Sequence, residues 1–206
     1  MNLKEEIFGK SKDEIWNKLA EELNGKYYQG AYAIPARVEV KHKNWTITLD
    51  TNLWTSVGRR PLSSKTRMTA AFYNKDEFVF HIVTKNLFNS IGKFFGAQDV
   101  IIGEPDFDNK FIIKSNNLNK VQTLFSNPII RDLLMILNDL YFEIRTENEI
   151  YNSEIPEGKN ELYFYVDDIV VDLDRLKIMF DLFSEVLNQL CHLDSAYEND
   201  PNLLLK

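Results

Sequence analysis

The sequence has 206 residues, of which 44% are hydrophobic and 13% aromatic, and its formal net charge is −7. This composition excludes a disordered chain, because disordered segments lack the apolar residues that build a core. The single cysteine, Cys191, excludes an intramolecular disulfide and favours a reducing compartment. The sequence starts without the apolar segment of a signal peptide and contains no apolar run of about 18 residues. We therefore expect a cytoplasmic protein without a membrane span.

Charge is unevenly distributed along the chain. Residues 31–75 contain eight Lys/Arg and two Asp/Glu, whereas residues 139–206 contain five Lys/Arg and sixteen Asp/Glu. Such asymmetry can mark an interaction surface. The alternative is that folding interleaves the two segments, so that their charges neutralise one another.

The first predicted element is a helix. Ser11 and Glu14 form a capping box, in which each side chain accepts a hydrogen bond from the backbone N–H of the other residue. Apolar residues at helical spacing follow, and Gly25 ends the helix.

Alternating apolar and polar residues then predict four strands. Strands that are apolar on one side suit an antiparallel sheet with one covered face. The strands are expected to form two hairpins, made of residues 31–41 with 45–51 and of residues 66–73 with 78–83.

The segment between these hairpins, residues 56–67, reads as a loop because it is rich in Gly, Pro and Ser. It carries four basic residues and no acidic one: Arg59, Arg60, Lys65 and Arg67. Such a cluster can bind an anion or an acidic partner. The other interpretation is a solvated loop that balances the acidic residues of the C-terminal third.

Residues 86–95 predict a short helix that ends at a glycine. The next stretch, residues 98–115, predicts a strand, a Gly/Pro turn and a second strand. Phe107 and Phe111 are expected in the core on either side of the turn, with Gly103 adopting a positive φ.

Two helices are expected in the middle of the chain. Asn116 or Asn117 can cap the first, and Asn127 with Pro128 starts the second, over residues 129–137. This second helix is strongly apolar, so we expect it to be buried. Residues 141–146 and 161–166 then predict two further strands.

The C-terminal helix, residues 173–190, has apolar residues three and four apart along its whole length. Asp172 and Asp174 lie where a negative charge complements the helix dipole. The tail over 193–206 is expected to fray.

These elements predict an α+β fold, with an antiparallel meander sheet covered by the long C-terminal helix and the pair of mid-chain helices. We expect one domain over residues 1–206, in which any sub-domain boundary lies near 96–105. The sequence contains no internal repeat.

Catalytic and metal-binding patterns are weak. The histidines lack the spacing of a zinc site, and Cys191 is better read as a buried residue than as a nucleophile. No nucleotide-binding, cofactor-binding or nucleic-acid-binding motif occurs, so we expect no cofactor and no nucleic-acid partner. One acidic cluster could bind a cation or act as acid and base, although an acidic turn explains it more simply; it comprises Asp99, Glu104, Asp106 and Asp108.

The segment with Gly103, Asp106, Phe107, Phe111 and Ile113, followed by two helices and a strand, resembles a bacterial domain family of unknown function. The resemblance covers about residues 66–190. It implies an α+β fold and no catalytic residue. Members of that family often carry N-terminal membrane spans, and this sequence departs from them in having none.

Three functional hypotheses remain open. The first is a non-enzymatic cytoplasmic interaction domain, such as an immunity-type protein that neutralises a toxin. It would bind a protein partner through the basic loop or through the acidic third, residues 139–206. The second is a small-molecule or lipid binder with an aromatic-lined cavity, formed by Phe72, Phe78, Phe80 and Phe88. The third is a hydrolase or metal enzyme that uses the carboxylates between Asp99 and Asp108. The sequence favours the non-enzymatic role.

Overall fold

The computed structural model describes residues 11–31, 34–53, 64–90, 98–146 and 159–198. The described helices are α2 (Lys12–Glu22), the 3₁₀ helix η1 (Lys85–Ser90), α3 (Pro105–Lys110), α4 (Leu118–Ser126), α5 (Pro128–Ile136) and α6 (Leu173–His192). The described strands are β1 (Lys26–Tyr28), β2 (Arg37–His42), β3 (Trp45–Leu53), β4 (Ser64–Phe72), β5 (Phe80–Thr84), β6 (Gln98–Asp99), β7 (Phe111–Ser115), β8 (Leu140–Arg145) and β9 (Asn160–Val166).

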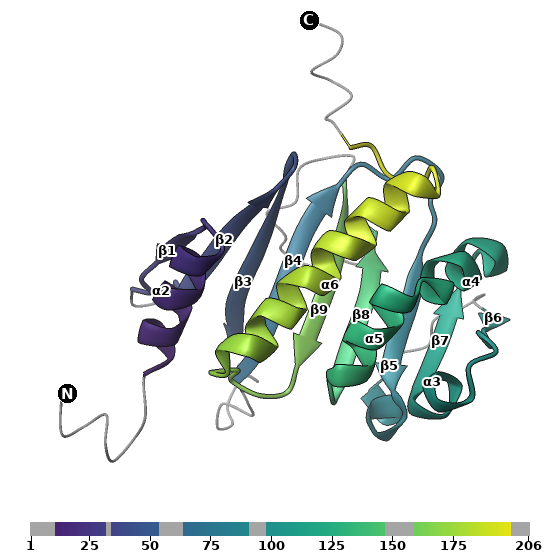
Figure 1. Cartoon of the computed structure of the whole chain (residues 1–206), viewed down its shortest axis with the longest axis horizontal. Helices are drawn as coiled ribbons and strands as arrows, with labels where there is room; N and C mark the ends of the chain where they lie inside the picture. Colours follow the sequence, from purple (N-terminus) through teal and green to yellow (C-terminus); the bar gives the residue numbers. More distant parts are fainter. Residues whose placement is uncertain (1–10, 32–33, 54–63, 91–97, 147–158, 199–206) are drawn as a thin grey trace, which may run out of the picture.

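All described strands belong to one antiparallel sheet, in the order β1-β2-β3-β4-β9-β8-β5-β7-β6. The long helix α6 crosses the middle of one face, and α2, α4 and α5 lie beside it on the same face (Figure 1). The fold is therefore α+β, with the long C-terminal helix and the two mid-chain helices covering an antiparallel sheet, as the sequence predicts. No described helix is both long enough and apolar enough to span a membrane.

One predicted hairpin is confirmed and the other is wrong. β2 and β3 pair through a tight turn at Lys43, whose φ of 52° lies in the left-handed region. β4 and β5 do not pair with each other, because β9 and β8 lie between them. The sheet therefore departs from a simple meander at its centre. β9 and β8 arrive from a distant part of the sequence, and local alternation carries no information about such pairing.

Register explains why the two faces of the sheet differ. Hydrogen-bonded neighbours on adjacent strands point to the same face. One such row consists of the apolar residues Val38, Leu49, Met68, Phe164, Phe142, Ile82 and Ile113. The adjacent row, which points to the other face, consists of Glu39, Thr48, Thr69, Tyr163, Glu143, His81 and Lys114.

The apolar face and the helices form the core. Phe80 contacts Phe125 and Phe142 edge to face, with ring centroids 5.2 and 5.4 Å apart. Trp16 of α2 is fully buried, and its Nε1 donates a hydrogen bond to the Val170 carbonyl oxygen at 3.1 Å. This bond ties the first described helix to the segment that precedes α6.

The predicted helix starts are confirmed. The side chains of Ser11, Asn117, Asn127 and Asp172 each accept a hydrogen bond from a backbone N–H in the first turn of the following helix. These bonds satisfy N–H groups that have no partner within the helix. Cap chemistry is local, so it can be read directly from the sequence.

The turn expected within residues 98–115 is only partly confirmed. Gly103 has a φ of 94°, and Phe107 and Phe111 are buried with ring centroids 4.8 Å apart, as expected. The residues between Gly103 and Phe111 form helix α3 rather than a turn, because Pro105 starts a helix as readily as a turn. β5 pairs with β7, so hydrogen bonds join strands that lie before and after the suggested boundary at 96–105.

Two further expectations are corrected in the mid-chain helices. The helix expected over 86–95 begins as η1, and residues 91–97 lie outside the described residues. α5 is buried on one side only, because Ile129 and Ile136 are 55% and 57% exposed. An apolar sequence does not require burial on all sides when the sheet beneath the helix offers one contact face.

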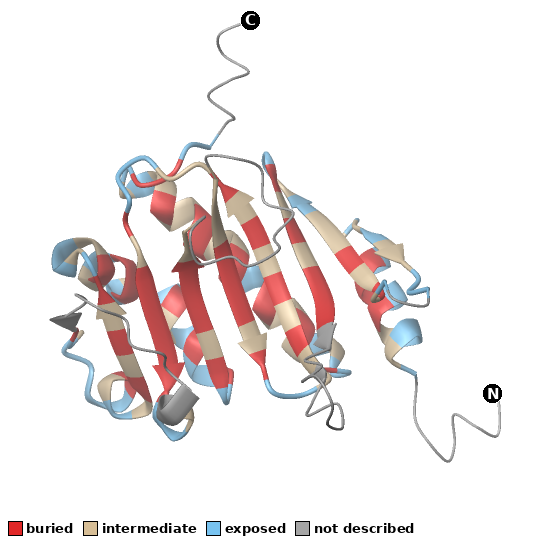
Figure 2. Ribbon diagram, turned by 180° about the vertical axis from the view of Figure 1, so that it is seen from behind, coloured by how far each residue is buried: buried red, intermediate tan, exposed pale blue. Residues whose placement is uncertain are grey.

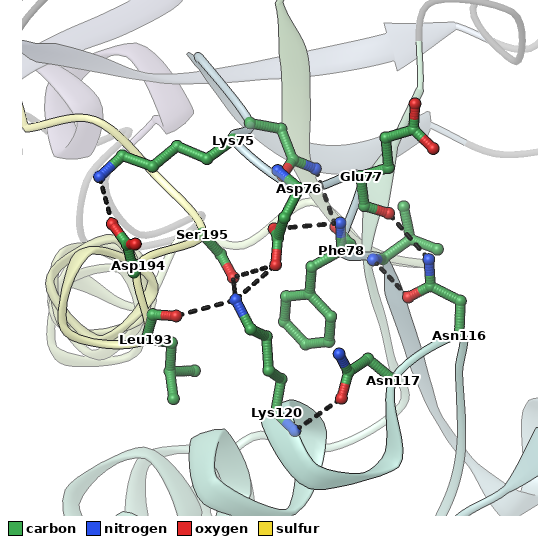
Figure 3. Close-up of polar contacts among 12 residues, drawn as sticks. Lys75, Asp76, Glu77, Phe78, Asn116, Asn117, Lys120, Leu193, Asp194 and Ser195 are labelled. Atoms are coloured by element: carbon green, nitrogen blue, oxygen red, sulfur yellow. Dashed lines mark hydrogen bonds and ion pairs between the residues drawn. The ribbon is translucent and has the colours of Figure 1, made fainter.

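Residues 193–198, which were expected to fray, are held in place by contacts to other segments. Figure 3 shows those of residues 193–195. Lys120 Nζ of α4 donates to the Leu193 carbonyl oxygen and to Ser195 Oγ, both at 2.8 Å, and forms an ion pair with Asp76. Ser195 is 1% exposed. The end of α6 is thus joined to α4 and to the connection between β4 and β5, while residues 199–206 lie outside the described part of the chain.

Candidate functional site

A cleft of about 540 Å³ lies beside the start of α6. Its apolar lining residues, which we call the floor, are Leu87, Ile136, Val166 and Ile178, and we call its acidic lining residues the rim. The rim aspartates are Asp139, Asp167, Asp168, Asp172 and Asp174, and the basic residue that lines the cleft is Arg175. The lining therefore combines an apolar surface with a strong excess of negative charge.

Three chain segments bring these aspartates together. Asp139 lies in the turn after α5 and has a φ of 51°. Asp167 and Asp168 directly follow β9, where the chain leaves the sheet toward α6. Asp172 caps α6, and Asp174 lies in its first turn. The end of the sheet and the start of the long helix thus meet at one place.

Local contacts hold some of the carboxylates without removing their charge. The Asp172 side chain accepts from the backbone N–H of Arg175 at 3.0 Å, and Asp139 accepts from the side-chain amide of Asn86. Arg175 Nη1 lies 4.0 Å from Asp168 Oδ2, although the Asp168 side chain is 70% exposed. An exposed pair at this separation interacts weakly. The carboxylate of Asp168 therefore stays accessible to a partner.

The lining of the cleft is suited to binding a cationic group. No group of three or more His, Cys, Asp or Glu side chains among the described residues is arranged to hold a metal ion. Apolar side chains next to several carboxylates lower the local dielectric constant and so strengthen the attraction of the carboxylates for a cationic group. A ligand that fits both parts of the lining carries a positive charge next to an apolar group.

Lys65 and Arg67, two of the four basic residues singled out in the sequence, lie on β4. Lys65 Nζ is 2.7 Å from Asp167 Oδ1 and 4.0 Å from the ring centroid of Tyr165. Arg67 donates from Nε to Asp50 Oδ1 at 2.7 Å and also contacts the second carboxylate oxygen. Both side chains thus have anionic partners within the protein.

Arg59 and Arg60 lie outside the described residues. The role of all four basic residues in binding a partner or an anion stays a prediction. The contact between Lys65 and Asp167 does show one link between the basic segment and the acidic third.

The face of the sheet opposite the described α-helices is turned toward the viewer in Figure 2. Side chains on this face form a second cluster, which we call the polar network. Arg145 lies at its centre, with Nε donating to Glu143 and its guanidinium carbon 3.1 Å from the ring centroid of Tyr163. Its members are Asp50, Arg67, His81, Tyr141, Glu143, Arg145, Glu161, Tyr163 and Tyr165. Sequence analysis missed this cluster, although the alternation within residues 141–145 and 161–165 places these side chains on one face.

Burial controls protonation within the polar network. It raises the pKa of Glu161 to about 7, against the opposing effect of Arg145 and Arg67. Burial, assisted by Arg145 and Lys114, lowers the pKa of His81 to about 4. His81 Nδ1 lies 3.4 Å from Glu143 Oε2. At neutral pH the histidine is therefore uncharged, and Glu161 is partly protonated.

The acidic cluster at 99–108 has local structural roles. Asp108 accepts from the backbone N–H groups of Ile102 and Gly103 at 2.9 and 2.8 Å. Glu104 forms an ion pair with Arg131 at 3.2 Å. None of these carboxylates lines the cleft beside α6.

The phenylalanines proposed to line a cavity belong to the core instead. Phe72, Phe78 and Phe80 are at most 1% exposed, and Phe80 is in edge contact with two other rings. They do not line the cleft. The side chain of Phe88 lies outside the described residues. Cys191 is half-buried, and this burial raises the pKa of its thiol, as expected for a packing residue.

No model of a known family matches the sequence, and no curated protein matches it. Among solved structures, the fold is similar to the crystal structure of the mycobacterial trehalose monomycolate transport factor A, TtfA. The two chains share 7% sequence identity with a TM-score of 0.53, over 86% of this chain and 95% of TtfA. At this identity the likeness concerns the fold alone.

Proposed function

We propose that this protein is a non-enzymatic interaction domain that docks a basic partner in the cleft beside the start of α6. The observation that carries the proposal is the lining of the cleft, in which five aspartates and one arginine surround an apolar floor. The cleft also lies within the acidic third of the sequence, which is the charged segment expected to bind a partner. A cytoplasmic location and membership of the bacterial family described above are part of the same proposal.

Charge complementarity supports a basic partner. A cluster of carboxylates attracts a basic ligand over one Debye length, which is about 10 Å at 0.1 M salt. The apolar floor adds burial that depends little on salt. Binding to the cleft should therefore weaken with salt without being abolished.

The experiment measures binding of two short fluorescent peptides of opposite charge. One contains Lys and Arg around a single Leu, and the other replaces each basic residue by Glu. We expect the basic peptide to bind and the acidic one not to bind. Equal binding of both, or no saturable binding of either, would contradict the proposal.

A matched pair of charge reversals locates the site. Asp168→Lys changes an exposed rim carboxylate. Glu21→Lys changes an exposed carboxylate by the same charge at the end of α2, which does not line the cleft. We expect Asp168→Lys to lower the affinity for the basic peptide about tenfold at low salt. Glu21→Lys should change that affinity by no more than about twofold. Equal effects of the two variants would mean that net charge alone drives binding.

An amphiphilic small molecule or lipid is the second candidate. The apolar floor beneath a polar rim favours it, and TtfA is named as a transport factor for trehalose monomycolate. An aromatic cavity plays no part in this version, because the floor is aliphatic. Saturable binding of an alkyl glycoside that is lost in Ile136→Asp and kept in Asp168→Lys would support it. Binding that is insensitive to Ile136→Asp would contradict it.

A further inference from the structure

The cleft continues into an apolar stripe on the outer surface of α5. Ile129, Leu133 and Ile136 are spaced by four and three residues, so they lie within about 60° of one another around the helix axis. Ile129 and Ile136 are more than half exposed. Ile136 also lines the cleft, so the stripe and the cleft form one continuous surface.

A row of acidic residues on α6 runs beside this stripe. Its acidic members are Asp174, Asp181 and Glu185, and Ile178 lies between the first two. The four residues follow one another at spacings of four, three and four, so they share one side of their helix. Asp174 and Asp181 are exposed, and Glu185 is half-buried.

The two helices are antiparallel neighbours. At one end Asn127 Nδ2 donates to Glu185 Oε1 at 3.0 Å, and at the other Ile136 and Arg175 meet in the cleft. Figure 1 shows α5 and α6 side by side on the same face of the sheet. Asp132, which is exposed on α5, adds a negative charge on the other side of the stripe. The apolar stripe is therefore bordered by acidic residues on both sides.

We infer that the partner presents an amphipathic basic α-helix, which lies along α5 and α6 and ends in the cleft. This inference rests on the proposed function and narrows it to one class of ligand. Apolar anchors at i, i+3 or i+4, and i+7 of the partner match the repeat of the stripe. Its Lys and Arg residues then face the acidic row and Asp132. The row from Asp174 to Glu185 spans about 16 Å, which corresponds to roughly three turns of a partner helix.

The electrostatics of the surface favour this class over an acidic or neutral helix. Basic side chains near the stripe already have partners in the protein. Arg131 pairs with Glu104 and Lys177 with Glu22. At the cleft end, Arg175 lies 4.0 Å from Asp168, and Lys110 donates to the carbonyl oxygens of Met135 and Leu137. An acidic helix would therefore meet like charges on both sides of its apolar anchors. A neutral amphipathic helix would leave the carboxylates of the acidic row desolvated without a counter-charge.

The test compares two peptides of identical composition and charge. One has about 16 residues with Leu at helical spacing and Lys or Arg on its other side, and the second contains the same residues in an order without helical periodicity. We expect the periodic peptide to bind roughly tenfold more tightly and to gain helical circular dichroism on binding.

A matched pair of protein variants tests the position of the helix. Ile129→Ser changes the stripe at the end away from the cleft, and Ile101→Ser changes an isoleucine that is 66% exposed elsewhere. We expect Ile129→Ser to weaken binding of the periodic peptide about fivefold and to leave binding of the aperiodic peptide unchanged. The reason is that only a bound helix would bury the exposed apolar area of α5. Ile101→Ser should affect neither peptide.

The outcomes separate the two proposals. If both peptides bind equally and both depend on Asp168, the helix inference is wrong and the basic docking cleft stands. If neither peptide binds, both proposals are wrong. If the periodic peptide binds more tightly but Ile129→Ser and Ile101→Ser have equal effects, the helix does not lie along α5.

Discussion

Acidic and basic side chains alternate across neighbouring strands in the polar network, whereas the cleft beside α6 gathers five aspartates around one arginine. In the network, Arg67 faces Asp50 and Arg145 contacts Glu143. In the cleft, the five aspartates are exposed, and among the described residues only Asp167, which pairs with Lys65 of β4, has a close basic partner. Buried charges must be neutralised within the protein, but exposed ones need not be. The unbalanced charge therefore marks the surface that is available to a partner.

The largest expected effect comes from removing the central cation of the polar network. Arg145→Ala leaves Glu143, which is 6% exposed, without its arginine partner and removes the contact with Tyr163. We expect the free energy of unfolding to fall by about 3 kcal/mol, because an uncompensated buried charge is costly. Denaturant unfolding at pH 7 measures it. A loss below about 1 kcal/mol would show that the charges of the network are solvated, as those of the cleft are, and would remove the contrast between the two regions.

A smaller effect on stability is expected from Glu161→Gln, and its size depends on pH. Burial raises the pKa of Glu161 from an ordinary value of 4.5 to about 7. The stability linked to its protonation is therefore fully present below pH 4.5 and is lost as the pH rises through 7. We expect the variant to be about 2 kcal/mol more stable than the native protein at pH 8 and equal to it near pH 4. A stabilisation that is the same at both pH values would exclude this linkage.

The stability linked to His81 should depend on pH in the opposite direction from that linked to Glu161. Its pKa is lowered from 6.5 to about 4 in the folded protein, so stability is present above pH 6.5 and is lost as the pH falls through 4. We expect the free energy of unfolding of His81→Gln to decrease by about 1 kcal/mol less than that of the parent protein between pH 6.5 and 4. The comparison belongs in a Glu161→Gln background, where the opposing contribution of Glu161 is absent. An unchanged slope between pH 6.5 and 4 would show that His81 is not the group that titrates.

The smallest effect on stability is expected for the arginine of the cleft. Arg175→Ala should change the free energy of unfolding by less than about 0.5 kcal/mol, because its pair with Asp168 is long and exposed. It should also tighten binding of the basic peptide by about threefold, because the lining loses its cation. Weaker binding would indicate that Arg175 orients the carboxylates for the ligand.

Local chemistry made much of the fold predictable from the sequence. The caps at Ser11 and Asn127 depend on neighbouring residues only, and each is found where the sequence predicts it. Of the two candidates for the next cap, the structure selects Asn117, and Asp172, expected to complement the helix dipole, also caps α6. The long C-terminal helix was predictable because its apolar repeat is regular over its whole length. The pairing of β4 with β9 could not be predicted, because it joins residues about a hundred positions apart.

The cleft was only partly predictable. The charge asymmetry pointed to residues 139–206, but the aspartates after β9 could equally be read as loop and cap residues. Asp172 is in fact a cap, and it still lines the cleft. The contribution of Asp139 required the tertiary structure, because the turn after α5 meets the start of α6 only once the sheet is assembled.

The most direct test of the docking cleft is a titration of the isotope-labelled protein with the basic peptide, followed by amide chemical shifts. We predict saturable shifts at residues 136–139, in the turn after α5, and at residues 166–178, which join β9 to α6. The residues of the polar network on β3, β4, β5, β8 and β9 should shift little. Shifts confined to the polar network, or no saturable shift at any residue, would contradict the account.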